Sequence, residues 1–229
     1  MSKLIDLMAK NKLTLIVSLP ENSAGLARAA IEGGADALKV HINITHKAAG
    51  TKFGSLEQER AALEEILEVA DVPVGIVPGE NVLPDEKQFG ELIKMGFDFY
   101  DIKIEHLPAW LLKAKKIGRI VALSKDYSID KLMGLSKLGV DGVEAAIVSA
   151  TDYGKDLNIG DLQGYISIAI SAGVPVVIPT QKAIRISEVP IIADTGAKGL
   201  MIGAIVTGKT VASIKKATRA FRAAIDDLG

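Results

Sequence analysis

The sequence predicts a (β/α)8 barrel, a closed ring of eight parallel strands with a helix after each, formed by all 229 residues as a single domain. Apolar runs rich in β-branched residues alternate with stretches whose apolar residues recur about every 3.6 positions. Glycine, which tolerates the left-handed conformation of a helix end, stands before the next strand in "EGGADAL", "KMGFDFY", "KLGVDGV", "SAGVPVV" and "DTGAKGL". Apolar residues make up 48% of the chain and aromatic residues only 4%. Such a core of small and branched aliphatic side chains suits a parallel sheet buried on both faces.

Eight strand–helix units in a chain of this length favour a closed barrel. The alternative is a doubly wound open sheet, but the first turn, "SLPENSAG", lacks the glycine pattern of a dinucleotide-binding loop. The predicted strands are 13–19, 37–43, 72–77, 97–105, 119–124, 142–149, 174–179 and 199–203. The predicted helices are 23–32, 56–69, 86–94, 109–115, 129–137, 159–171, 186–194 and 211–228.

Charge and composition exclude several classes of function. The formal net charge is −1, with both signs scattered along the chain, so neither a nucleic acid nor a membrane surface is expected as a partner. The chain has no cysteine, which excludes disulfides and thiolate chemistry, and its three histidines leave little room for a histidine-rich metal site. The start, "MSKLIDLMAK", lacks the features of a signal peptide, so a cytoplasmic location is expected.

Candidate catalytic residues lie on two predicted strands. In a barrel of this kind the active site is formed at the carboxyl ends of the strands, and side chains alternate between the two faces of each strand. In 37–43, Leu38, Val40 and Ile42 suit the helix layer, so Lys39, His41 and Asn43 are expected to face the barrel interior. In 97–105 the same alternation sends three charged side chains inward: Asp101, Lys103 and Glu105. Because an unpaired buried charge is costly, these lysines and carboxylates are expected to pair, either for catalysis or only to fill the barrel.

Two further features belong to the same face. Glu144 is the only ionisable group in "GVEAAIVSA", and it is expected to act as a general acid or base or to pair with a neighbouring lysine. The loop 44–55, which carries His46, Lys47 and Lys52, is expected to be a mobile lid over an anion. The alternatives are a rigid loop anchored on the barrel rim by Phe53, or a loop buried in a subunit contact.

A phosphate site is expected near the end of the chain. Barrels that bind phosphate commonly hold it between the loops after the seventh and eighth strands, with backbone N–H groups and a short helix. Here the seventh strand leads into Thr180 and Gln181, and the eighth leads into Gly203 and Ala204. The small residues allow close backbone approach, and Thr180 and Gln181 can donate from the other side.

The chain resembles the ribulose-phosphate-binding barrel superfamily and, within it, is most similar in layout to N-acetylmannosamine-6-phosphate epimerase-like proteins. The similar segments include "LIVSLP", "ARAAIEGGADALKV", "SKLGVDGVEAAIVSATDYGK" and "GAKGLMIGAIVTG". The resemblance implies a phosphate site at "IGAIVTG". It does not carry over the epimerase's proton-transfer residues, a lysine after the third strand and a glutamate near the end of the seventh. Those positions read Val77-Pro78-Gly79 and Pro179-Thr180-Gln181 here. "YDIKIEHLPAW" is also similar to a segment of orotidine-phosphate decarboxylase-like barrels, with Asp101 and Lys103 matching.

The leading hypothesis is an enzyme that acts on a small phosphorylated sugar or keto acid by proton transfer next to a carbonyl, or by a related carbon–carbon cleavage. The alternatives are a Schiff-base aldolase that uses Lys39 or Lys103, and a non-catalytic sugar-phosphate-binding protein. No cofactor is expected, or else a divalent metal ion on Asp101, Glu105 or Glu144. A homodimer is possible.

Overall fold

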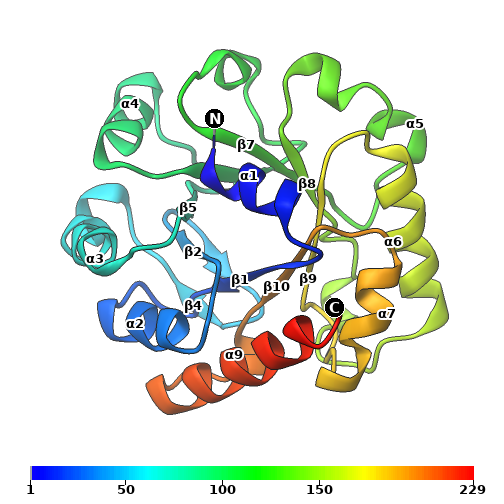
Figure 1. Ribbon diagram of the computed structural model, residues 1–229. Coiled ribbons are helices and arrows are strands. Elements are labelled where there is room, and N and C mark those ends of the chain that lie inside the picture. Colours follow the sequence, from blue (N-terminus) through cyan, green and yellow to red (C-terminus); the bar gives the residue numbers. More distant parts are fainter. Residues whose placement is uncertain (1) are drawn as a thin grey trace.

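Eight parallel strands close into a barrel in the computed structural model, which describes residues 2–229 (Figure 1). The first strand pairs with both the second and the last, which closes the ring. In barrel order the strands are β1 (Thr14–Ser18), β2 (Ala37–His41), β5 (Val74–Val77), β6 (Phe99–Lys103), β7 (Gly118–Ala122), β8 (Gly142–Glu144), β9 (Val176–Pro179) and β10 (Gly199–Ile202). The prediction of a single (β/α)8 barrel is confirmed, with strands shorter than expected at their ends.

Helices cover the outside of the ring. The regular ones are α2 (Ala24–Glu32), α3 (Leu56–Val69), α4 (Glu86–Met95), α6 (Ile159–Ser171), α7 (Val189–Asp194) and α9 (Val211–Asp226). Short turns of helix complete the loops: η3 (Ala150–Asp152), η4 (Ile186–Glu188) and α8 (Ala204–Thr207). Side chains cap the starts of α3, α4, α6 and α9 in reciprocal pairs, for example Ser55 with Gln58. Between residues 2 and 229, no helix combines the length and the apolar character needed to cross a membrane.

Two of the predicted helices are wrong in type. The segment predicted at 109–115 forms the 3-10 helix η1 (Ala109–Lys113), and the segment at 129–137 divides into α5 (Ile129–Leu132) and the 3-10 helix η2 (Leu135–Leu138). Gly134 lies between the last two with a φ of +96°, a left-handed conformation that interrupts a helix. The apolar residues of both segments recur at helical spacing, but this periodicity does not reveal where the helical backbone is interrupted.

An N-terminal helix, α1 (Lys3–Lys10), lies across one opening of the barrel (Figure 1). Its Leu4 and Met8 are buried against interior side chains of the strands, including Ile16, Phe99 and Val177. The carboxylate of Asp98 accepts hydrogen bonds from the start of this helix: the Ser2 hydroxyl at 2.7 Å, and the backbone N–H groups of residues 3 and 4 at 2.8 and 3.0 Å. This helix, which the sequence analysis did not predict, leaves only the opposite end of the barrel for a site.

The predicted strand register is correct for most positions. Leu38, Val40 and Ile42 belong to the large apolar cluster between the strands and the helices. Tyr100 and Ile102 belong to the same cluster, so the intervening Lys39, His41 and Asp101 face the barrel interior, where they are buried. The alternation therefore places charged groups above an apolar floor formed with α1.

The tight packing at this floor gives a stability prediction. A Cβ added at Gly75 would lie 2.1 Å from ring atoms of Phe99, which is 2% exposed. Gly75→Ala should therefore lower the free energy of unfolding by about 1–3 kcal/mol, measured by urea denaturation. Gly90→Ala is the matched control, because no atom lies within 4 Å of a Cβ at this position in α4 and alanine favours a helix. A Gly75 variant as stable as the Gly90 variant would contradict this account of the packing.

Candidate active site

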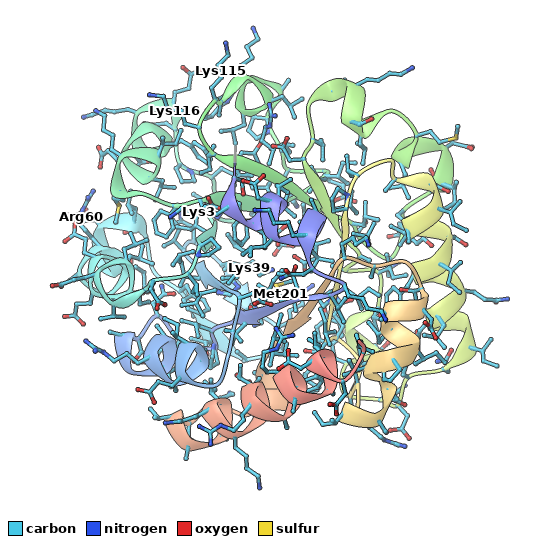
Figure 2. All side chains as sticks on the ribbon, viewed as in Figure 1. Lys3, Lys39, Arg60, Lys115, Lys116 and Met201 are labelled. Carbon is cyan, nitrogen blue, oxygen red and sulfur yellow. The ribbon has the colours of Figure 1, made fainter. Side chains whose placement is uncertain are left out.

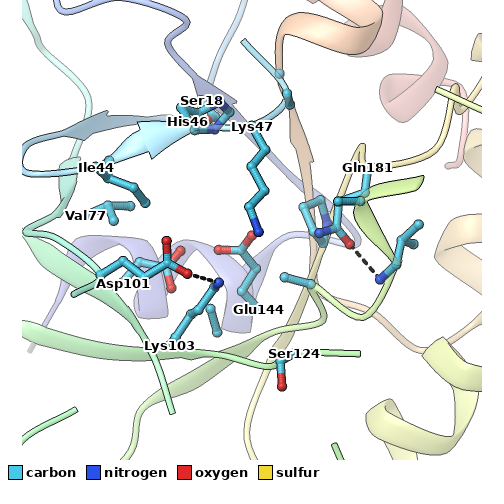
Figure 3. A pocket seen from close by; sticks show the side chains of 18 of the residues that line it. Ser18, Ile44, His46, Lys47, Val77, Asp101, Lys103, Ser124, Glu144 and Gln181 are labelled. Atoms are coloured by element: carbon cyan, nitrogen blue, oxygen red, sulfur yellow. Dashed lines mark hydrogen bonds and ion pairs between the residues drawn. The ribbon is translucent and has the colours of Figure 1, made fainter. Parts of the chain in front are cut away.

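A cavity of about 410 Å³ opens at the carboxyl ends of the strands (Figure 3). Every strand of the barrel contributes to its lining, which includes Ser18, Lys39, His41, Val77, Asp101, Lys103, Ala122, Glu144, Pro179 and Met201. The loops after the strands add His46, Lys47, Glu80, Ser124, Tyr153 and Gln181, among others. The cavity therefore lies at the end of the barrel where the site is predicted.

A buried ion cluster forms the deepest part of the cavity. Lys39 Nζ lies 2.8 Å from Asp101 Oδ2 and 2.8 Å from Glu144 Oε2, and all three side chains are less than a tenth exposed. They project from β2, β6 and β8, alternate strands of the ring, as do the side chains that form one layer inside such barrels. Met201, from β10, lies on the fourth alternate strand, and Figure 2 shows Lys39 and Met201 near the centre of the barrel.

The three groups of this Lys39 cluster set one another's charge. Burial raises the pKa of Glu144 to about 8, and the adjacent Asp101 carboxylate adds to the effect. Burial also disfavours the charged form of Asp101, but the Lys39 ammonium outweighs it and lowers the pKa of Asp101 below its ordinary value. Burial alone would lower the pKa of Lys39, yet the two carboxyl groups hold it above its usual range. At neutral pH the cluster is therefore an ammonium, a carboxylate and a carboxylic acid, with no net charge.

His41 lies next to the cluster and is neutral. It is 1% exposed, and its Nε2 is 3.5 Å from the Ser18 hydroxyl, while its Nδ1 is buried without a partner in the described part of the chain. Burial lowers the pKa of His41 far below its ordinary value, and the nearby His46 and Lys39 act in the same direction. His41 thus borders the site as an uncharged ring that contacts Phe53 at a centroid distance of 4.9 Å.

Lys103 lines the cavity as expected, whereas Glu105 does not. Lys103 lies nearer the mouth than Lys39 and forms an ion pair with Glu80. Glu105 is exposed, does not line the cavity, and accepts a hydrogen bond from the Ser124 hydroxyl. The prediction that Glu105 points into the barrel is wrong, because β6 ends at Lys103 and the chain turns there, with the N–H of His106 bonded to the Lys103 carbonyl.

The expected phosphate residues lie at one edge of the cavity. The Thr180 hydroxyl accepts a hydrogen bond from the N–H of Gly203 at 2.9 Å, which links the loops after β9 and β10. Both ends of the Gln181 amide form hydrogen bonds, since Oε1 accepts from the Val148 N–H at 3.0 Å and Nε2 donates to the Tyr153 hydroxyl at 2.7 Å. Ala204 begins α8 just outside the lining.

The segment 44–55 is a β-hairpin of β3 (Thr45–His46) and β4 (Thr51–Lys52). Phe53 and Ala49 are buried, at 4% and 1% exposure, and the Lys209 ammonium donates to the Ala49 carbonyl. This corresponds to the alternative in which Phe53 anchors the segment on the rim. Lys47 extends from this hairpin across the mouth of the cavity (Figure 3).

Several lining residues, among them Ser18, Ala122 and Met201, were not predicted from the sequence, and two further ones hold predicted site residues in place. Tyr153 holds Gln181 by a hydrogen bond, and Glu80 holds Lys103 by an ion pair. Both lie in loops, where no alternation indicates the direction of a side chain. The sequence does offer one indication for Glu80, which follows the last strand residue, Val77, by only three positions and is therefore expected near the carboxyl end of β5.

Within residues 2–229, no three His, Asp or Glu side chains gather in the manner of metal ligands. The expected metal alternative relied on Asp101, Glu105 and Glu144. Glu105 lies outside the lining, and the Lys39 ammonium already sits within 2.8 Å of both other carboxyl groups. The donor set therefore does not fit a divalent cation, because Lys39 occupies the position such an ion would take.

No known protein-family profile matches the sequence, and no protein of curated function matches it. Solved structures resemble the fold over nearly the whole chain. A thiamine phosphate pyrophosphorylase from Pyrococcus furiosus has a TM-score of 0.67 at 18% identity, covering 96% of this chain and 98% of that one. A chain of tryptophan synthase from M. tuberculosis gives 0.74 at 15% identity, covering 98% and 99%. A phosphoribosyl anthranilate isomerase from Thermus thermophilus gives 0.68 at 13% identity, covering 95% and 100%. These likenesses establish the barrel fold.

The raised pKa of Glu144 predicts a pH dependence of stability. Because its pKa is about 8 in the folded protein and near 4.5 in the unfolded chain, folding takes up a proton between these values. The stabilisation is complete below pH 4.5 and is lost as the pH rises through 8, with a slope of up to about 1.4 kcal/mol per pH unit. Glu144→Gln, which cannot ionise, should remove this slope.

Urea denaturation of both proteins at several pH values measures the difference. The wild type should lose stability relative to Glu144→Gln as the pH rises across that window. Glu105→Gln, at the exposed carboxylate outside the cavity, should run parallel to the wild type. Parallel curves for Glu144→Gln as well would show that Glu144 is ionised at neutral pH and would contradict the assignment.

Proposed function

We propose that the protein is an enzyme that transfers a proton next to the carbonyl group of a small phosphorylated sugar or keto acid. Isomerisation, epimerisation or a related carbon–carbon cleavage would follow from that step. The observation that carries the proposal is the Lys39 cluster at the bottom of the cavity, in which one of two neighbouring carboxyl groups is ionised and the other is protonated at neutral pH. Pairs of titratable groups separated in this way are the usual acid and base of such reactions.

The cluster divides the chemistry between its members. The Asp101 carboxylate is the base that takes the proton from the carbon, while protonated Glu144 is the acid that can return one to carbon or oxygen. The Lys39 ammonium supplies positive charge close to both carboxyl groups, which stabilises the enolate that forms between the two transfers. Little water reaches this depth, and low polarity strengthens each of these interactions.

The Schiff-base alternative is less well supported for Lys39. A Schiff base requires a neutral amine, whereas the two carboxyl groups hold the pKa of Lys39 above its usual range and keep it charged. Lys103 is the remaining candidate, in an ion pair with Glu80 near the mouth. Trapping with borohydride in the presence of a substrate would reveal such an adduct by mass.

The phosphorylated part of the proposed substrate is supported by the edge formed by Thr180 and Gly203. The Thr180 hydroxyl accepts from the Gly203 N–H and keeps its own proton for donation to an anion. Two of the structural neighbours are by name a thiamine phosphate pyrophosphorylase and a phosphoribosyl anthranilate isomerase. These observations support the proposal that the chain is related to the ribulose-phosphate-binding barrels, without the epimerase chemistry whose lysine and glutamate it lacks. A homodimer and a cytoplasmic location stay predictions from the sequence.

The reaction class can be tested before the substrate is known. An enzyme that removes a proton next to a carbonyl exchanges it with solvent, so proton NMR in heavy water should show loss of that signal. The protein is incubated with a panel of phosphorylated sugars and keto acids that includes D-ribulose 5-phosphate and N-acetylmannosamine 6-phosphate. Asp101→Asn and Glu144→Gln should each slow the exchange about 100-fold or more, because each removes one proton-transfer group.

Glu105→Gln is the control for this experiment, since it removes a carboxylate of the same segment that lies outside the cavity. It should leave exchange unchanged. Binding of sugar phosphates without exchange of any member of the panel would favour the non-catalytic alternative. Exchange that survives both cavity substitutions would place the chemistry elsewhere.

The phosphate edge has its own test. A side chain at Gly203 would project past Ser18, whose nearest atoms are 3.7 and 3.9 Å from the added Cβ, and the backbone there is extended. Gly203→Leu should therefore fold normally but weaken binding of D-ribulose 5-phosphate by about 10-fold or more, measured by calorimetry, because the new side chain fills the anion's space. Gly90→Leu, on the surface of α4, is the control. Equal affinities would remove this edge from the site.

A further inference from the structure

His46 has a fixed tautomer, set by the backbone of its own hairpin. Its Nδ1 accepts a hydrogen bond from the N–H of Ala49 at 3.1 Å, so the ring proton resides on Nε2. Nε2 donates to no group in the described part of the chain, and it is not among the buried polar atoms. Since His46 lines the cavity, this N–H is available to a molecule bound there.

The position of the ring is also fixed. It packs edge-on against His41 at a centroid distance of 4.6 Å and against Phe53 at 6.5 Å. Ala49, which supplies the N–H, has its carbonyl held by the Lys209 ammonium and is 1% exposed. The ring and its donor are therefore held in place before a molecule binds in the cavity, so donation by this N–H requires little further ordering at that moment.

The charged groups near His46 keep it neutral. Burial, and to a lesser extent the Lys39 ammonium, lower the pKa of His46 to about 4. The other ring it contacts, His41, is itself neutral for the same reasons. An imidazole in this state holds its Nε2 proton firmly, so it donates a hydrogen bond without giving the proton away.

We propose that the Nε2–H of His46 donates a hydrogen bond to the substrate oxygen that becomes negative during proton transfer. This inference rests on the proposed function. When a proton leaves the carbon for a carboxylate, the electrons of the broken C–H bond form the C=C bond, and those of the carbonyl pass to its oxygen. His46 stabilises that oxygen and retains its own proton throughout.

The first arm of the test does not depend on activity. Nitrogen-15 NMR of the histidine rings distinguishes the two tautomers and the protonated form. His46 should show the Nε2–H tautomer and no titration from about pH 5.5 to about pH 8.5. A proton on Nδ1, or titration in that range, would overturn the inference whatever the enzyme's reaction.

The second arm measures the same exchange in heavy water as above. His46→Leu removes the donor and should lower kcat about 100-fold with little change in KM, as expected for a contact made in the transition state. His46→Gln keeps an N–H donor and should recover part of that loss. His106→Gln, at the histidine outside the cavity lining, should behave as the wild type.

The outcomes separate the two proposals. Exchange by the wild type that is unchanged in His46→Leu would overturn the role of His46 and leave the proposed function intact. Loss of affinity alone, with kcat preserved, would make His46 a binding residue and also overturn the inference. No exchange by the wild type on any member of the panel would overturn both.

Discussion

The structure of the barrel interior depends on the contact between one ammonium and two carboxyl groups. Lys39, Asp101 and Glu144 are each less than a tenth exposed, and isolated charges at that depth would cost several kcal/mol each. The cluster is tolerated because it carries no net charge once Glu144 holds a proton. The layer therefore fills the barrel as an ordinary interior does, and it keeps acid and base in contact. A change at any one member alters the electrostatic environment of the other two.

The two ends of the barrel, on either side of this layer, differ in structure: one is closed by apolar side chains and the other contains the cavity. On one side, α1 and Phe99 close the interior with apolar side chains, and Gly75 leaves room for the ring. On the other, the hairpin and the loops after β9 and β10 leave a cavity of about 410 Å³. In the described residues 2–229, apolar side chains lie on one side of the cluster and the cavity lies on the other. Stability and access to the reacting groups are thus assigned to opposite ends of one sheet.

Most of this arrangement could be predicted where the backbone is regular. The alternation in 38–42 and 100–103 placed Lys39, His41 and Asp101 inside correctly, because a strand of known direction leaves only two choices for each side chain. It failed for Glu105, two residues after the strand ends. Pairing of Glu144 with a lysine was one of the two expectations, but which lysine could not be predicted, since β2 and β8 are not neighbours and the stagger of the strands decides which levels face one another. Tyr153 lies in a loop and His46 in a two-residue strand of the hairpin, where alternation along a barrel strand gives no direction.

The bonds from Asp98 to the start of α1 bear on the order in which the chain assembles. Residues 2 to 4 precede their acceptor, Asp98 just before β6, by some 95 positions in the chain. The helix they begin covers a floor that includes Val177 and Met201, from β9 and β10. This floor combines Ile16 from β1, Phe99 from β6 and Met201 from β10, so it is complete only when strands from distant parts of the chain have come together. Docking of α1 therefore depends on contacts that are distant in sequence, which are the slow ones to form in folding.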